Sequence, residues 1–269
     1  MTRTRVKILI ASLACMSHPT AVHAQTDSTH TEQKTQNDIT WAIGAGGMRS
    51  PAWLGSSRVR NDFLPYFAFN WHDIVELSVT DGLNIDLVRG SAWHGGLIGT
   101  WRRGRTSRDL GALAKAGVAS LSHTWQAGVY LEHVPVKNLT LGASLSHDIQ
   151  STGSAYGNVY IEWDIPALKP VEHSLKLNGE FMNRSAMRRY FSVPADTAAA
   201  LGVQAYHPSE GASGTRLSYE AFLPTSRSTG ISLGFHWTRL ASKPAASPLV
   251  RDYGDRMQRF YLAAFLVHF

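Results

Sequence analysis

The chain has 269 residues, a formal net charge of +6 and a mean hydropathy of −0.16, with 43% hydrophobic and 17% charged residues. Soluble domains typically carry about 25% charged residues, so the composition argues against an ordinary soluble domain. The modest hydropathy argues against a bundle of membrane-spanning helices. Strands that alternate apolar and polar residues, as a transmembrane β-barrel requires, fit both values.

Residues 1–24 have the three parts of a secretory signal peptide. A basic start precedes a short apolar stretch at 8–16, and Val22-His23-Ala24 then gives a small residue at the cleavage position, so cleavage is predicted after Ala24. A helix that spans a bilayer needs about 20 residues, so this stretch is too short for an anchor. Part of the basic charge leaves with the signal peptide, and no nucleic-acid partner is predicted.

Residues 25–39 are polar and are predicted to form a disordered periplasmic leader. From Trp41 onward, apolar residues recur on one parity and small or polar residues on the other, which is typical of β-strands. The alternating segments lie near 41–45, 63–71, 75–79, 83–87, 93–101, 125–131, 139–145, 159–165, 175–181, 217–223, 231–237 and 261–269. Pro65 falls inside the second segment, and because proline cannot donate to a ladder, a bulge is expected there.

The connections between these segments alternate between long and short. The predicted extracellular loops are 48–61, 80–82, 102–122, 148–154, 183–214 and 239–258. The predicted periplasmic turns are near 72–73, 89–92, 134–138, 166–171 and 224–229. Residues 40–269 are therefore predicted to form an all-β, antiparallel, up-and-down transmembrane barrel of about 12 strands with periplasmic termini, located in the outer membrane. A soluble β-sandwich remains the alternative.

Seven charged residues lie on the parity opposite the apolar side chains and are predicted to face the lumen. They are Glu76, Asp86, Glu162, Asp164, Lys176, Glu180 and Glu220. These residues could line a pore or could form ion pairs that plug it. Barrels of eight strands are filled and barrels of sixteen are open, so the strand number leaves both alternatives.

One predicted extracellular loop is markedly basic, and its residues are candidates for contact with lipopolysaccharide phosphates. They are Arg102, Arg103, Arg105, Arg108 and Lys115. Guanidinium groups suit bidentate binding of phosphate, although charge runs are often plain solvated segments. Membrane lipid and lipopolysaccharide are accordingly predicted partners.

The last segment has one strongly aromatic face that ends the chain. Tyr261, Phe265, Val267 and Phe269 share this face and are predicted to be the signal recognised by the barrel-assembly machinery. The opposite face of the segment is also mostly apolar. Because this second face is apolar, we expect it to pack against other groups inside the lumen. This packing favours a filled interior over an open pore.

No pattern of residues indicates catalysis. Among the histidines that remain after cleavage, His94 and His236 have lumen parity. His147 and Asp148 are neighbours on a strand, so their side chains point to opposite faces. There is no HxH or HExxH spacing for a metal. The chain is predicted to be non-enzymatic, without catalytic residues, cofactor or metal.

Several stretches resemble, in order, the MipA/OmpV family of outer-membrane proteins. They are 44–47, 50–56, 63–66, 189–193, 201–206, 239–241 and 247–250, and Ala52-Trp53 departs from the acidic residue and tyrosine usual there. The resemblance implies an outer-membrane barrel. The family's namesake is described as a scaffold that joins MltA, a murein lytic transglycosylase, to a peptidoglycan synthase.

The leading hypothesis is therefore a barrel that anchors or scaffolds murein-processing machinery. A narrow porin-like channel for small solutes is the first alternative. A surface adhesin or envelope-stress protein, acting through the loops at 102–122 and 183–214, is the second.

Overall fold

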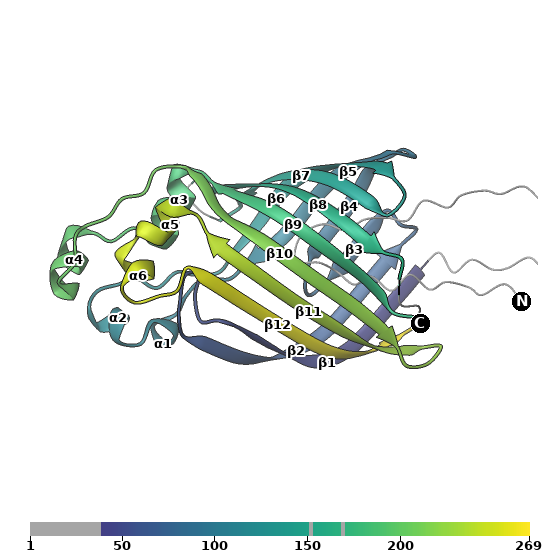
Figure 1. Cartoon of the computed structure of the whole chain (residues 1–269), viewed down its shortest axis with the longest axis horizontal. Helices are drawn as coiled ribbons and strands as arrows, with labels where there is room; N and C mark the ends of the chain where they lie inside the picture. Colours follow the sequence, from purple (N-terminus) through teal and green to yellow (C-terminus); the bar gives the residue numbers. More distant parts are fainter. Residues whose placement is uncertain (1–38, 151–152, 168–169) are drawn as a thin grey trace, which may run out of the picture.

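A computed structural model describes residues 39–150, 153–167 and 170–269, so the predicted signal peptide and leader up to residue 38 lie outside the described residues. The described residues form one closed barrel of twelve strands (Figure 1). The strands are β1 Ile39–Pro51, β2 Val59–Trp71, β3 Val75–Ser78, β4 Gly82–Arg89, β5 Trp93–Arg102, β6 Thr124–Val136, β7 Leu139–Asp148, β8 Ala155–Ile165, β9 Glu172–Met182, β10 Gly211–Pro224, β11 Thr229–Leu240 and β12 Met257–His268.

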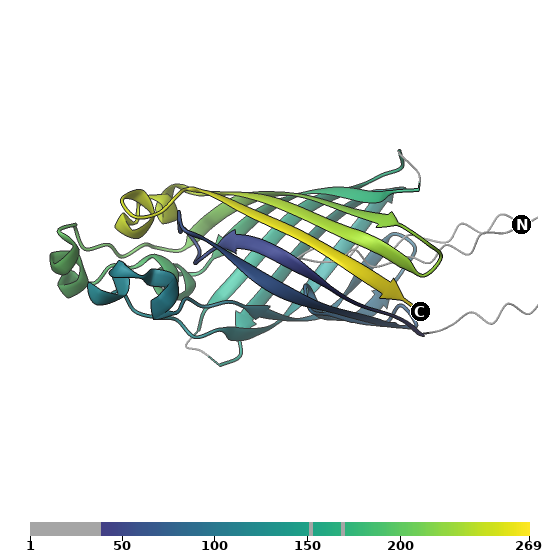
Figure 2. The same cartoon turned by 90° about the horizontal axis from the view of Figure 1, so that it is seen from below.

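Every strand pairs antiparallel with its neighbours in the chain, and β12 also pairs with β1 to close the barrel. The predicted up-and-down topology and strand number are confirmed. One end of the barrel, here called the loop end, carries the long connections, and the other, the turn end, carries short ones (Figures 1 and 2). The start of β1 and the end of β12 both lie at the turn end.

Six short helices occupy the long connections of the described chain. They are α1 Ser107–Leu110, α2 Ala112–Lys115, α3 Arg184–Phe191, α4 Ala195–Leu201, α5 Ser242–Ala246 and α6 Pro248–Arg251. In the described ranges, no helix is both long and apolar enough to cross a membrane. The helices pack into two hydrophobic clusters, one around Trp53 and Leu249 and the other around Met187 and Phe191. These clusters form a cap at the loop end.

The outer face of the barrel carries exposed apolar side chains with tryptophans grouped at both ends. Trp41, Trp71, Trp93 and Trp163 lie toward the turn end, and Trp101, Trp125 and Trp237 lie toward the loop end. Aromatic rings at both ends of an apolar band match the two interfaces of a bilayer. The alternation in the sequence therefore separates a lipid face from an interior.

The hairpin of β3 and β4 is shorter than its neighbours. β3 pairs with β2 only from Ala68 to Trp71, so residues 59–67 of β2 have no ladder on that side within the described chain. The expected bulge at Pro65 is wrong, because the register between β1 and β2 runs through Pro65 without a shift. The carbonyl oxygen of Phe67 accepts a hydrogen bond from Val79 N, on the side of β2 that faces β3. Backbone groups two residues apart in a strand point to the same side, so the nitrogen of Pro65 faces this side as well. The N–H that proline lacks would therefore have pointed to the open edge of β2.

Candidate functional site

The interior of the barrel is the first candidate site, and polar side chains line one of its walls. Of the seven charged residues that were predicted to face it, five are buried there. They are Glu76, Asp86, Glu162, Lys176 and Glu220. Asp164 and Glu180 are half-buried, and an ion pair joins Glu180 to Arg216 of the neighbouring strand. The structure thus brings acidic residues from several strands into one enclosed space.

Lys176 lies at the centre of this polar wall and is only 2% exposed. Its Nζ lies 2.9 Å from Glu162 Oε2 and 4.0 Å from the centroid of the Tyr160 ring. The Tyr160 hydroxyl in turn donates to Glu132 Oε1 over 2.6 Å. Glu132 was missed from the sequence because the alternating pattern was followed only as far as Leu131, one residue too short.

Asp86 anchors a second group of polar contacts in the interior. The Tyr130 hydroxyl donates to Asp86 Oδ1 over 2.6 Å, and His94 Nδ1 lies 3.8 Å from Asp86 Oδ2. His236, the other histidine with lumen parity, lies 2.8 Å from the Ser218 hydroxyl. The Asp86 group offers charge pairing and hydrogen bonding. Ser218 and His236 place a hydroxyl beside an imidazole, but among the described residues no carboxylate bonds to that imidazole to complete a catalytic triad.

The opposite wall of the interior is apolar. Ala42 and Tyr66 of β1 and β2 pack with Phe222 of β10 and with Ala264 and Leu266 of β12. The second face of the closing strand thus packs against other interior side chains. On its outward face, Tyr261, Phe265 and Phe269 are exposed and Val267 is half-buried. Phe269 stacks on Trp41 with ring centroids 4.2 Å apart.

The basic residues of the β5–β6 loop do not act as one group. Arg105 is 4% exposed and donates to the carbonyls of Ala119 and Tyr190, so it holds the cap together. Burial lowers its pKa to about 10. Arg102 lies over the ring of Tyr156, 4.1 Å from the centroid.

Of the remaining three basic residues, Arg103 donates to Asp62 Oδ2 over 3.0 Å. Arg108 and Lys115 are exposed to solvent. Only these two therefore stay free for contact with an external phosphate, and that contact remains a prediction.

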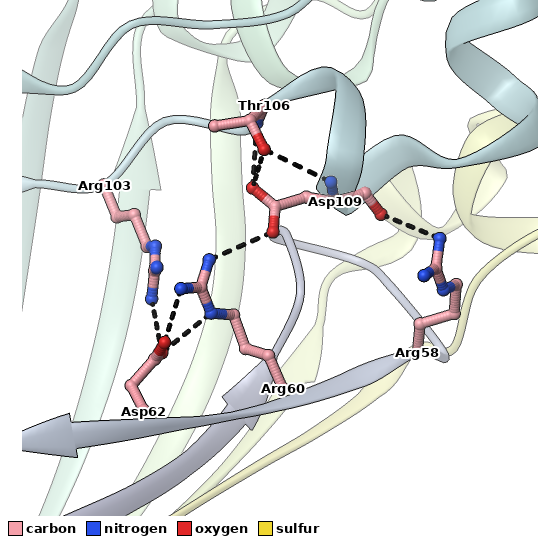
Figure 3. A network of polar contacts seen from close by, with 6 residues as sticks. All are labelled: Arg58, Arg60, Asp62, Arg103, Thr106 and Asp109. Atoms are coloured by element: carbon pink, nitrogen blue, oxygen red, sulfur yellow. Dashed lines mark hydrogen bonds and ion pairs between the residues drawn. The ribbon is translucent and has the colours of Figure 1, made fainter.

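The second candidate site is a polar network that ties β2 to α1 at the loop end (Figure 3). Arg60 pairs with Asp62 on its own strand and reaches Asp109 Oδ1 over 3.0 Å. Arg103 approaches Asp62 from the other side, and Arg58 donates to the Asp109 carbonyl over 3.3 Å. The network crosses the open edge of β2, where no ladder joins that strand to β5 in the described chain.

Asp109 also begins α1 through a capping box with Thr106. Its carboxylate accepts from the Thr106 amide and hydroxyl, each over 2.8 Å, and the hydroxyl accepts from the Asp109 amide over 3.2 Å. Burial, the largest influence on the pKa of Asp109, would raise it. The bonds from Thr106 and the charges of Arg60 and Arg103 outweigh burial and hold this pKa below its ordinary value of 3.8.

This lowered pKa predicts an acid-sensitive cap. A carboxylate whose folded pKa is depressed stabilises the fold above its unfolded pKa and loses that contribution as the pH falls through the folded value. We expect amide protection of α1, corrected for intrinsic exchange, to be constant above about pH 5 and to fall below 3.8. Hydrogen-exchange mass spectrometry measures it.

Asp109→Asn is the control for this prediction. It should lower protection at neutral pH by about 1 kcal/mol, the order of cost of a lost capping interaction, and should weaken the pH dependence of the protection. An unchanged pH profile in this variant would assign the acid sensitivity to another group.

Groups of three or more metal-ligating side chains do not occur among the residues that the structure describes. His147 is exposed, whereas Asp148 is buried and accepts from Thr124, Gln126 and Tyr156. The two side chains therefore point to opposite faces of β7.

A closed barrel with an apolar outer band, two aromatic girdles and a polar interior defines the class of protein as an outer-membrane β-barrel. A family model described as "MltA-interacting protein MipA" matches residues 43–269. The chain belongs to this family, as its resemblances predicted.

The chain also resembles solved structures of a porin and of an outer membrane protein. The NanC porin aligns with a TM-score of 0.42 and 9% identity over 84% of this chain and 98% of that chain. OprD from Pseudomonas aeruginosa aligns with a TM-score of 0.34 and 10% identity over 77% of this chain and 55% of that chain. A search of curated protein sequences found no match.

Proposed function

We propose that the protein is a non-enzymatic outer-membrane anchor that docks murein-processing machinery at its turn end. The family description, MltA-interacting protein, names the kind of partner: a murein lytic transglycosylase. The observation that carries the proposal is the close packing of many interior side chains. Side chains from facing walls, including Glu132, Lys176, Phe222 and Leu266, are at most 2% exposed. A barrel filled in this way acts through its rims rather than through a water-filled path.

The backbone of the turn end gives independent support. His72, Asp73 and Asn138, the non-glycine residues with positive φ in the described chain, all lie in turns at this end. The turn between β2 and β3 has φ of 54° at both His72 and Asp73, where Asn-Gly is the favoured pair. Strained backbone of this kind clusters at functional sites. His72 and Asp73 are also exposed, so they are available to a periplasmic partner.

Photo-crosslinking in intact envelopes tests the docking proposal. A photoreactive residue is placed at Asp73, Lys137 or Arg227 in the turns, and at Ala199 or Ser242 at the loop end as matched positions. We expect the turn positions to recover a lytic transglycosylase or a peptidoglycan synthase and the loop positions to recover neither. Recovery of neither enzyme from any turn position would overturn the proposal.

Planar-bilayer recordings separate the anchor from the narrow channel. Because these interior side chains are buried, the refolded protein is expected to give no steady conductance. Reproducible conductance steps would favour the channel. They would show that the packing of the interior does not block the passage of ions, and the proposal would lose its main support.

A further inference from the structure

A small pocket opens in the cap, where loops from distant parts of the chain meet. It has a volume of about 380 Å³, within the range usual for small-molecule sites. Its floor is apolar: Trp53 comes from the β1–β2 loop, Leu110 and Leu113 from α1 and α2, and Leu201 from α4. In Figure 1 these helices gather at the loop end. The pocket opens to solvent, because four further lining residues are exposed: Ser57, Arg58, Ala112 and Tyr253.

The walls of this pocket are fixed by hydrogen bonds between loops. The Tyr253 hydroxyl donates to the Leu201 carbonyl over 3.1 Å, and the Ser57 hydroxyl donates to the Tyr253 carbonyl over 3.3 Å. Trp53 and Leu110 are buried in one hydrophobic cluster that contains parts of all four long loops lining the pocket. A pocket with walls held in this way is formed before any ligand binds, which reduces the ordering cost of binding.

One charged residue lines the pocket, and no carboxylate does so among the described lining residues. That residue is Arg58, whose guanidinium donates to the neutral carbonyl of Asp109 over 3.3 Å. Arg60 and Arg103, its neighbours in the network of Figure 3, are each neutralised by a carboxylate. Among the described residues, therefore, no carboxylate pairs with Arg58, which is exposed at the mouth of an apolar pocket.

We propose that this pocket binds a small amphipathic anion, with its apolar body on Trp53 and Leu113 and its carboxylate on Arg58. The guanidinium presents parallel donors that suit a carboxylate. The apolar floor accounts for the body of the ligand, because burying apolar surface is the main favourable term in binding. Medium-chain fatty acids have both features, and octanoate is the probe.

Cysteine protection tests the proposal. Cys15 is the only cysteine of the sequence and falls in the predicted signal peptide, so an added cysteine is the only thiol of the exported chain. Ala112 lines the pocket and is exposed. Labelling of Ala112→Cys by neutral N-ethylmaleimide should slow about tenfold when octanoate is present at about ten times its dissociation constant. Ser242→Cys, an exposed position outside the pocket, should label at an unchanged rate.

Two comparisons test the role of charge. Octan-1-ol has the same chain length and no charge, so it should protect Ala112→Cys only at about tenfold higher concentration. A tenfold loss of affinity is about what one charge-assisted hydrogen bond contributes. Adding Arg58→Gln should remove this difference between octanoate and octanol. Arg251→Gln, which removes an exposed arginine of α6 outside the pocket, should leave the difference intact.

Three results would overturn the proposal: no protection by octanoate, equal slowing at Ala112→Cys and Ser242→Cys, or an unchanged difference in Arg58→Gln. Equal slowing would show partition of octanoate into the membrane. If Ala112→Cys does not fold, Ser57→Cys repeats the measurement from the other wall of the pocket. None of these readouts involves a periplasmic partner, so the docking proposal is tested separately.

Discussion

Replacing Lys176 with methionine is expected to lower the free energy of unfolding of the barrel by about 3–5 kcal/mol, the usual cost of removing one partner of a buried ion pair. Methionine fills a similar volume but leaves Glu162 without the cation that lies 2.9 Å away. The Tyr160 ring loses the same cation. Urea unfolding in detergent micelles, followed by tryptophan fluorescence and by heat-modifiable migration, measures the change.

The double variant Lys176→Met with Glu162→Gln distinguishes the charge from the packing. It removes the stranded carboxylate as well, so it should recover most of the lost stability. Lys137→Met, on an exposed turn, is the matched control and should change the stability by less than about 0.5 kcal/mol. A double variant as unstable as Lys176→Met alone would mean that the shape of the lysine, not its charge, matters here.

Replacing Gly46 with alanine is expected to weaken closure of the barrel between β1 and β12. Gly46 lies opposite Ala264, and an added Cβ would lie 2.1 Å from the Ala263 carbonyl and 2.6 Å from the Ala264 Cα. Both are backbone atoms of the closing strand and cannot rotate away. The expected cost is about 1–3 kcal/mol, as for other overpacked sites, measured by the same urea titration.

The adjacent residue supplies the control for this prediction. Gly47 points to the outer face, and the nearest atom to an added Cβ is the Asp62 carbonyl oxygen at 3.9 Å. Gly47→Ala should therefore be neutral or should stabilise the barrel by about 0.5–1 kcal/mol, because alanine loses less backbone entropy than glycine. Equal destabilisation by both variants would mean that alanine in β1 is itself unfavourable, and that contact with β12 is not the cause.

Much of the architecture could be predicted because a strand has a fixed period of two residues. That period assigns Lys176 to the interior and Leu177 to the lipid face from the sequence alone. The number of strands, the antiparallel order and the alternation of long and short connections follow from the same pattern. The alternating pattern does not indicate at which residue the hydrogen-bonded pairing of a strand ends. Val79 continues the alternation of β3, although that strand pairs only as far as Ser78.

The cap could not be predicted in the same way, because loop residues follow no period and their partners are distant in sequence. Arg103 and Arg105 look alike in the sequence, yet Arg103 pairs with Asp62 at the network and Arg105 is buried against Tyr190. The pocket beside Arg58 likewise exists only where four loops meet. The sequence by itself determined the barrel and its two faces, since these depend on local periodicity. Only the tertiary structure decided which charges are paired, which stay exposed and where the loops enclose a cavity, since these depend on contacts between residues far apart in the chain.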